Sequence, residues 1–397
     1  MKSRPSLIST FPVVSELDRF LAEAVANGIP AVTLHVRHHG QVLYEHAAGW
    51  LDPDTHQQPN QPTNHPSNHP SNQPSIQPTT YFDLASLTKL FTATAFLRLV
   101  AAGKVKLATP VADVLPQFTG RRPIQPYEDP LHPGQFLRVG ATGKTTGAQD
   151  VTFHQLLAHT SGLPAWRPLY RQPANAIHEF TLGTFFAYPT GATVLYSDLG
   201  FILLGWAIER LTGRSLDQAI AQLVCNQLNL SQIRFGPLPP GQTAPTEICP
   251  WRGRRIHGEV HDENAWAMGG IAGHAGLFGS GAAVAAFGQA WLDALGGASH
   301  FLPPPLALQA GSLQAEAGTV RRGLGWALWS PDPDSPAHPL STEAFGHTGF
   351  TGTSLYVDPQ RRLVIACLTN ELYNGRQNRA ITPFRRALHE LIVRLLQ

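Results

Sequence analysis

The sequence lacks the features of several common protein classes. Its only cysteines are three widely spaced residues, Cys225, Cys249 and Cys367. They form no C-x-x-C pair and are odd in number, so they predict reduced thiols and not a disulfide framework. No run of eighteen or more apolar residues occurs, so we expect no transmembrane helix. The first twenty residues lack an apolar stretch typical of a secretion signal, so we expect a cytoplasmic protein.

The charge pattern and the missing nucleotide motifs narrow the function further. The formal net charge is only +2, and the densest basic stretch is the short cluster around Arg254, which predicts a solvated or locally paired loop. We therefore expect no nucleic-acid partner. Neither G-x-G-x-x-G after a strand nor G-x-x-x-x-G-K-[ST] occurs, so no nucleotide cofactor is expected. The missing G-x-S-x-G motif disfavours the α/β-hydrolase type of serine enzyme.

What remains is a chain that is 43% hydrophobic and able to bury a sizeable core. Helical spacing at residues 15–26, with Ser15 as N-cap and Gly28 as stop, precedes a hairpin of strands 31–37 and 41–48. Further helices are expected at 82–102, with Asp83 near its cap, 152–158, 199–212, 215–228 and 383–396. Strands are expected at 323–329, 352–357 and 362–369.

This order of elements predicts an α+β fold. The simplest arrangement is a single domain over 1–397 in which both chain ends build one antiparallel sheet, flanked by the terminal helices. The sheet subdomain would comprise about 12–56 plus 318–397, and a mostly helical subdomain at about 81–317 would be inserted into it. A substrate cleft is expected between the two.

Residues 57–80 form a low-complexity segment. From Gln61 the sequence runs through five tetrads, QPTN, HPSN, HPSN, QPSI and QPTT, with proline at the second position of each tetrad. Such a segment has almost no apolar residues to bury, so we expect a disordered, exposed insertion. Its two histidines are interpreted as solvated and not as metal ligands.

Ser86 and Lys89 are the first candidates for chemistry. Residues i and i+3 share a face of a helix, so the hydroxyl and the ammonium can touch. A serine hydroxyl needs a base to become a good nucleophile, and burial lowers the pKa of a lysine toward that role. The chain has only five lysines, and Lys89 stands in an apolar helix where a surface charge would be awkward. The alternative is an ordinary surface pair on a helix.

Two other motifs carry candidate groups. Tyr196 precedes Ser197, Asp198 and an apolar segment; its phenol either packs on the core or, beside an ammonium, shuttles protons. His347-Thr348-Gly349 precedes a strand, where glycine lets a substrate approach the backbone, although a plain glycine-rich turn is the alternative.

His261, Asp262 and His274 are a further polar set, yet their spacing matches no zinc motif such as H-E-x-x-H. We interpret them, and His159, as side chains that bond loop backbone. No metal site is predicted. A metal-dependent hydrolase built on these three residues remains a rival hypothesis.

Taken together, these motifs resemble the S-x-x-K, Y-x-N and K-T-G set of the serine β-lactamase and penicillin-binding-protein superfamily. The resemblance is to the class C-like branch, which includes esterases and D-amino-acid peptidases. The motifs have the order and spacing expected for this branch. The resemblance covers most of the chain, from about residue 15 to the end, and excludes the insertion. The stretches that carry it are FDLASLTKLFTA (82–93), LLAHTSGLP (156–164), GEVHDENAWAMGGIAGHAGLFGS (258–280) and GHTGFTGTSLYVDP (346–359).

The resemblance implies roles for these residues. Ser86 would be the acylated nucleophile, Lys89 would hold or take its proton, and Tyr196 would act as general base and then general acid. The backbone N–H groups of Ser86 and Phe350 would form the oxyanion hole. Substrate would lie along Thr348 and Gly349, with Asp198 and His347 as further substrate-binding residues.

Two departures from the pattern bear on the substrate. Asp198 stands where many relatives have asparagine; an ionised carboxylate cannot donate to a substrate amide, and pairing with Lys89 would keep that lysine charged. His347 replaces a lysine, so capture of a substrate carboxylate should weaken. We therefore expect a cofactor-free hydrolase that acts on an ester or amide bond of a small molecule or peptide. An esterase or a D-amino-acid peptidase is expected ahead of an efficient β-lactamase. The alternative is a catalytically silent binding protein on the same scaffold.

Overall fold

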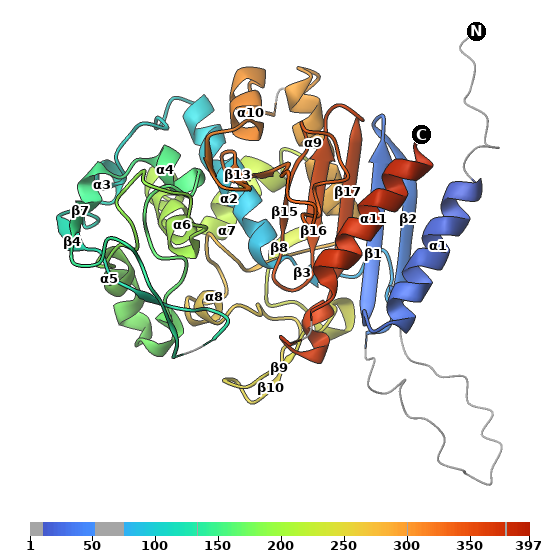
Figure 1. The fold of residues 1–397 in the computed structure, drawn as a ribbon, viewed down its shortest axis with the longest axis horizontal. Helices are drawn as coiled ribbons and strands as arrows, with labels where there is room; N and C mark the ends of the chain where they lie inside the picture. Colours follow the sequence, from blue (N-terminus) through green and yellow to red (C-terminus); the bar gives the residue numbers. More distant parts are fainter. Residues whose placement is uncertain (1–10, 52–74, 133, 300, 378) are drawn as a thin grey trace.

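The chain folds around one eight-stranded antiparallel sheet with the strand order β12-β13-β14-β15-β16-β17-β1-β2 (Figure 1). The computed structural model describes residues 11–51, 75–132, 134–299, 301–377 and 379–397. Both chain ends supply strands, as predicted, so the α+β fold class is confirmed. The strands are β1 (Ala31–His38), β2 (Gln41–Gly49), β12 (Ala315–Ala317), β13 (Val320–Arg322), β14 (Ala327–Leu328), β15 (Phe345–Thr348), β16 (Ser354–Asp358) and β17 (Leu363–Thr369).

Helices cover both faces of the sheet. The terminal helices α1 (Phe11–Ala26) and α11 (Ile381–Leu395) lie side by side on one face, where Phe20 stacks on Phe384 with ring centroids 5.5 Å apart (Figure 1). Helix α9 (Gly281–Leu295) packs on the other face, close to β1, β16 and β17. Strand β1 alternates between these layers because successive side chains of a strand point to opposite faces.

The helical part of the molecule lies beside the sheet (Figure 1). Its small sheet β3-β11-β8 adjoins the nucleophile segment. The helices are α2 (Thr88–Ala101), α3 (Val111–Val114), α4 (Phe153–Leu157), α5 (Ile177–Leu182), α6 (Asp198–Thr212), α7 (Leu216–Ile220), α8 (Glu263–Ala267) and α10 (Pro304–Gly311). The short strands are β3 (Phe82–Asp83), β4 (Arg121–Pro123), β5 (Tyr127–Glu128), β6 (Phe136–Leu137), β7 (Thr145–Gly147), β8 (Ile233–Phe235), β9 (Ile248–Cys249), β10 (Arg254–Arg255) and β11 (Leu277–Gly279).

The first predicted elements are largely confirmed. The β1–β2 hairpin turns at His39 and Gly40, whose φ values of 50° and 78° suit a tight two-residue turn. Gly28, with φ of 103°, follows the end of α1 as the predicted stop. The predicted start was wrong, because α1 begins at Phe11 and Ser15 lies within it.

Two other predicted elements need correction. The helix expected over 82–102 is interrupted: Phe82–Asp83 is strand β3, residues Ala85–Leu87 form a 3₁₀ turn, and α2 starts only at Thr88. The strand expected over 323–329 is reduced to β14, because Gly325 adopts a φ of 84° that breaks an extended run.

The predicted insertion at 57–80 lies mostly outside the described residues. Its last residues are described: Ser75 bridges to Trp50 and Ile76 is buried at 3% exposure, whereas Gln77 and Thr79 are exposed, as predicted. The three cysteines are buried free thiols. In the described part of the chain, none of the helices combines the length and the apolar character needed to cross a bilayer. The limits of the two subdomains remain a prediction. Helix α9 falls within the predicted helical subdomain but packs on the sheet.

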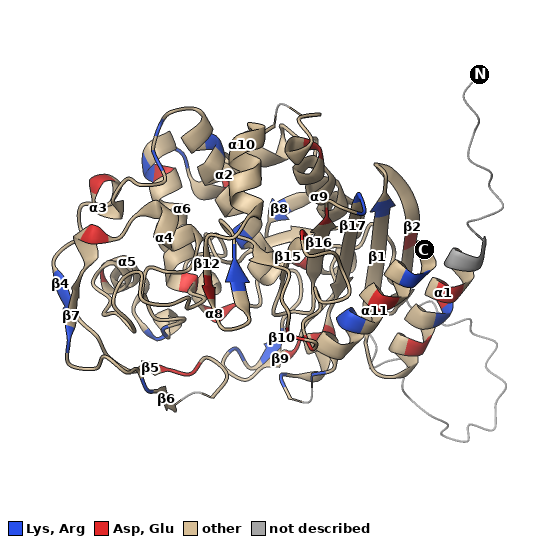
Figure 2. Cartoon of the chain, turned by 45° about the horizontal axis from the view of Figure 1, so that its top comes forward, with Lys and Arg blue, Asp and Glu red and all other residues tan. Residues whose placement is uncertain are grey.

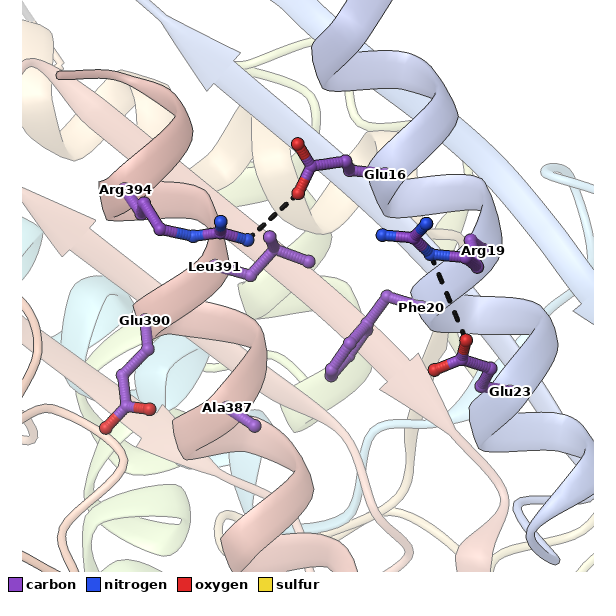
Figure 3. Close-up of a pocket in the computed structure, with 8 residues that line it drawn as sticks. All are labelled: Glu16, Arg19, Phe20, Glu23, Ala387, Glu390, Leu391 and Arg394. Atoms are coloured by element: carbon purple, nitrogen blue, oxygen red, sulfur yellow. Dashed lines mark hydrogen bonds and ion pairs between the residues drawn. The ribbon is translucent and has the colours of Figure 1, made fainter.

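Acidic and basic residues are interspersed along the chain (Figure 2), in keeping with the small net charge. A groove between α1 and α11 contains two ion pairs, Arg394–Glu16 at 2.9 Å and Arg19–Glu23 at 3.9 Å (Figure 3). Residues of the two terminal helices line this groove, and none of the predicted site residues is among them. It is therefore separate from the candidate active site.

Candidate active site

Ser86 stands on a strained turn between β3 and α2. The Asp83 carboxylate accepts hydrogen bonds from the backbone N–H of Ala85 at 2.8 Å and of His261 at 2.6 Å. Ala85 has a φ of +46°, which is uncommon for a residue with a side chain. Strain of this kind persists only where the surroundings impose it, and it is typical of functional turns. The turn leaves Ser86 partly exposed among buried neighbours.

Lys89 is fully buried and lies at the centre of the site. Its Nζ donates to Ser86 Oγ at 2.9 Å and to the carbonyl of His274 at 3.2 Å, and lies 2.7 Å from Asp198 Oδ1. Two of its N–H groups are therefore used in hydrogen bonds, and the Asp198 carboxylate balances its charge as an ion pair. Burial alone would lower the pKa of Lys89, but the Asp198 carboxylate and Tyr196 raise it above the usual value. Lys89 is therefore an ammonium in this structure.

Tyr196 is placed beside Lys89 by the N-terminus of α6. Ser197 caps this helix by accepting from Gly200 N–H at 3.3 Å, and its hydroxyl donates to the Pro164 carbonyl at 2.7 Å. The cap holds its neighbours Tyr196 and Asp198 close to the lysine. Lys89 Nζ lies 4.8 Å from the Tyr196 ring centroid.

The Tyr196 hydroxyl is buried and makes no well-formed hydrogen bond with any described residue. Burial raises the pKa of Tyr196, and Asp198 raises it further, although Lys89 and Ser86 act in the opposite direction. The tyrosine is thus a neutral phenol beside a lysine ammonium. Both predicted proton carriers hold their protons before substrate arrives.

The turn after β15 packs directly on the nucleophile segment. Thr351 Oγ1 donates to the Asp83 carbonyl at 2.7 Å, and Thr353 Oγ1 donates to the Leu84 carbonyl at 3.1 Å. At Gly349 an added Cβ would lie 2.6 Å from the Leu84 carbonyl oxygen, so only glycine fits there. These contacts bring the segments of Phe350 and Ser86, the two predicted oxyanion donors, against each other.

His347 is a neutral imidazole. Burial, with the nearby cations Arg322 and Lys89, lowers its pKa to about 3. Nδ1 lies 2.8 Å from the Thr348 carbonyl and must donate to it, which leaves Nε2 as an acceptor. The positive charge that a lysine would supply at this position is therefore absent at neutral pH, as predicted.

Arginines missed by the sequence reasoning surround the site. Arg385 of α11 donates to the carbonyls of Gly349 at 3.3 Å and Thr353 at 2.7 Å, and Arg379 donates to the Phe350 carbonyl. These bonds fix the turn that carries Phe350. Arg322 of β13 lies with its guanidinium carbon 5.2 Å from the Tyr196 ring centroid. No motif marks these three residues, because only the folded chain brings them to the site.

The predicted set His261, Asp262 and His274 is divided in the structure. Asp262 Oδ1 lies 2.9 Å from His274 Nε2 and accepts from Ala265 N–H at 2.7 Å, which caps α8. His261 instead lies 2.9 Å from Glu247. Possible ligand atoms of Asp198, Asp262 and His274 lie within 4.8 Å of one another, but the Lys89 ammonium already neutralises Asp198.

His159 accepts a hydrogen bond from Ser197 N–H through Nδ1 at 3.1 Å. It therefore bonds loop backbone, as interpreted from the sequence.

Curated proteins resemble this chain over most of its length. The chain is 29% identical over 389 residues to the Escherichia coli K12 protein named "Putative D-alanyl-D-alanine carboxypeptidase", covering 90% of this chain and 82% of that one. It is 29% identical over 398 residues to the N-acetylmuramyl-L-alanine amidase of Bacillus subtilis 168, covering 90% and 80%.

Solved structures share the fold. EstCE1, a hydrolase with promiscuous acyltransferase activity, matches with a TM-score of 0.70 at 18% identity, covering 97% of this chain and all of that one. The octameric penicillin-binding protein homologue from Pyrococcus abyssi matches with a TM-score of 0.66 at 19% identity, covering 95% and 77%. The family model described as Beta-lactamase matches residues 17–390. The chain therefore belongs to the Beta-lactamase family of serine hydrolases.

Proposed function

We propose that the protein hydrolyses a carboxylic ester, amide or peptide through an acyl-enzyme on Ser86. The observation that carries the proposal is the position of the Lys89 ammonium, 2.9 Å from Ser86 Oγ and 2.7 Å from Asp198 Oδ1. A lysine that only stabilised the fold would not need to be buried against a partly exposed serine hydroxyl.

The chemistry follows from the protonation states. The Lys89–Tyr196 pair must first lose one proton, because both groups are protonated. Ser86 Oγ then attacks the carbonyl carbon while its proton passes to the pair, and N–H groups of Ser86 and Phe350 stabilise the oxyanion. When the tetrahedral intermediate collapses, Tyr196 returns a proton to the leaving alcohol or amine. Water cleaves the acyl-enzyme by the same steps in reverse.

The neutral His347 supports a preference among substrates. It supplies no positive charge, so it cannot take the place of a lysine in binding the carboxylate of a penicillin. The names of two relatives at 29% identity, a putative D-alanyl-D-alanine carboxypeptidase and an N-acetylmuramyl-L-alanine amidase, refer to peptide and amide bonds. We therefore place esters and D-amino-acid peptides ahead of β-lactams.

The direct test is a search for the covalent intermediate. The purified protein is incubated separately with an activated ester and with a penicillin, and the intact mass and the modified peptide are determined. We expect an acyl adduct on Ser86 from the ester. Adducts from both would favour a penicillin-recognising enzyme. No adduct and no turnover would favour a silent ligand-binding protein.

The Asp198–Lys89 pair predicts a specific pH dependence. Since the carboxylate raises the pKa of Lys89, replacing Asp198 with asparagine should lower that pKa. The deprotonated lysine would then form at lower pH. The rising limb of kcat/KM against pH should move down by about one to three pH units.

The control for this shift is Asp113→Asn, which alters an exposed aspartate on α3. It should leave the pH profile in place. An unmoved profile in the Asp198 variant would show that Lys89 does not control this limb.

A further inference from the structure

We propose that Arg385 of α11 is a positioning residue whose buried guanidinium makes the Phe350 N–H a stronger donor to the oxyanion of the tetrahedral intermediate. This inference rests on the proposed function and adds to it a residue that no motif marks. It goes beyond the fixing of the turn, because it assigns a part in the reaction to the positive charge of the arginine.

The Phe350 N–H is free to bind a substrate oxygen. It donates to none of the described residues, whereas the N–H groups of Gly349 and Gly352 donate to the Thr353 carbonyl at 2.7 Å and to the Gly349 carbonyl at 3.1 Å. The same turn packs on the nucleophile segment, where Thr353 Oγ1 donates to the Leu84 carbonyl. A free N–H in a turn that contacts the nucleophile segment suits a site for negative charge on oxygen.

Arg385 binds the other end of the same peptide group. The peptide between Gly349 and Phe350 carries this N–H and the Gly349 carbonyl, to which Arg385 Nη2 donates at 3.3 Å. Nη2 also donates to the Thr353 carbonyl at 2.7 Å, which holds the guanidinium in place. A cation on the oxygen of an amide draws electron density from its nitrogen, so the N–H becomes a stronger donor. Hydrogen bonds that follow one another in a chain strengthen each other in this way.

The charge of Arg385 is not balanced by a carboxylate in the part of the chain that the structure describes. The residue is only 4% exposed, its Nε makes no hydrogen bond, and it forms no ion pair there. Burial lowers the pKa of Arg385 to about 10, so the group is still a cation at neutral pH. The nearby Glu371 carboxylate is neutralised by Arg379, which lies 2.8 Å from it.

A buried cation without an anion is costly in the resting protein. An anion appears during the proposed reaction: as Ser86 Oγ bonds to the carbonyl carbon, the π electron pair of that carbonyl moves to its oxygen. With the Phe350 N–H on this oxygen, one peptide group lies between the new negative charge and Arg385. A fixed positive charge of this kind stabilises the tetrahedral state more than the uncharged substrate, so its effect should fall on kcat and not on KM.

Arg122 offers a matched comparison. It is also buried, and it donates to the carbonyls of Thr184 at 3.0 Å and Thr119 at 2.9 Å without an ion pair to any described carboxylate. It stands on β4, however, and its hydrogen bonds reach carbonyls outside the candidate active site. Burial on backbone carbonyls therefore does not by itself imply a part in catalysis, and the peptide that Arg385 binds is what distinguishes it.

The test separates the charge of Arg385 from its hydrogen bonds. Arg385→Lys keeps a positively charged donor, whereas Arg385→Gln keeps an N–H donor without the charge. With an activated ester, Arg385→Gln should lower kcat by at least about tenfold and change KM by less than about twofold, and Arg385→Lys should retain most of kcat. Arg122→Gln should leave both constants at their wild-type values. Thermal unfolding is measured for each variant, and the kinetics are recorded well below the midpoint.

A boronic acid that carries the acyl group of the ester gives a second measurement. Its adduct with Ser86 is a tetrahedral anion, so it reports on the stabilisation of negative charge without turnover. The inhibition constant should rise in Arg385→Gln by about the factor by which kcat falls, and it should stay unchanged in Arg122→Gln.

The outcomes separate this inference from the proposed function. Wild-type kcat in Arg385→Gln, or equal losses in Arg385→Gln and Arg385→Lys, overturns the role of the charge while Ser86→Ala still abolishes turnover. Failure of either Arg385 variant to fold would overturn it as well, by showing that the arginine serves the structure. Turnover that survives Ser86→Ala would instead overturn the proposed mechanism itself.

Discussion

Replacing Ser86 with alanine is expected to lower kcat for an activated ester by about 10⁴-fold or more, since nucleophile and base act as one unit. The fold should survive, because the Ser86 hydroxyl is one of three oxygens around Lys89, and Asp198 still pairs with that ammonium. The measurement is single-turnover and steady-state hydrolysis, with thermal unfolding as the check of the fold.

The matched control is Ser215→Ala, which changes an exposed serine before α7 whose side chain makes no capping bond. It should retain full activity. If Ser86→Ala kept more than about a tenth of wild-type kcat, the nucleophile would lie elsewhere. Inhibition of that activity by a chelator would then favour the Asp198–Asp262–His274 set as a metal site.

The reactive groups could be predicted from the sequence where the interacting residues are close together in the chain. Ser86 and Lys89 are three residues apart, and this spacing alone implies that they can touch. A pairing of Asp198 with Lys89 was one alternative that the sequence left open, and the structure places the two groups 2.7 Å apart. Their catalytic roles remain predictions.

The rest of the site depends on contacts that the sequence does not show. The run from Phe82 resembles a continuous helix, yet Phe82 and Asp83 pair with β11 almost two hundred residues later. This pairing and the Asp83–His261 bond force the turn at Ala85. Arg322 was missed for a similar reason: its place beside Tyr196 depends on the order of strands in the sheet.

The apolar stretch at 323–329 was predicted as a strand, but only Ala327–Leu328 forms one. Leu324 and Trp326 are buried, as a core strand requires. However, Gly323 lies so close to the Ala310 carbonyl that a Cβ would be 2.1 Å from its oxygen. The segment is therefore a tight, buried turn that leads from β13 to β14. A glycine in an apolar run often marks such a close backbone approach.

Lys89→Met is expected to be nearly as damaging to catalysis as Ser86→Ala, with a loss of about 10³- to 10⁴-fold in kcat. It should also destabilise the fold by about 3 kcal/mol, because the Asp198 carboxylate, 19% exposed, loses the cation 2.7 Å away. Urea unfolding measures this second effect independently of activity.

The double variant Lys89→Met/Asp198→Asn separates the two effects. Removing the carboxylate as well leaves no unpaired charge at this position, so the double variant should regain most of the lost stability. It should not regain activity, because no group remains 2.9 Å from Ser86 Oγ to accept its proton. Recovery of both would mean that Lys89 only neutralises Asp198 and that Tyr196 alone activates the serine. Recovery of stability alone would identify Lys89 as part of the proton path to and from Ser86.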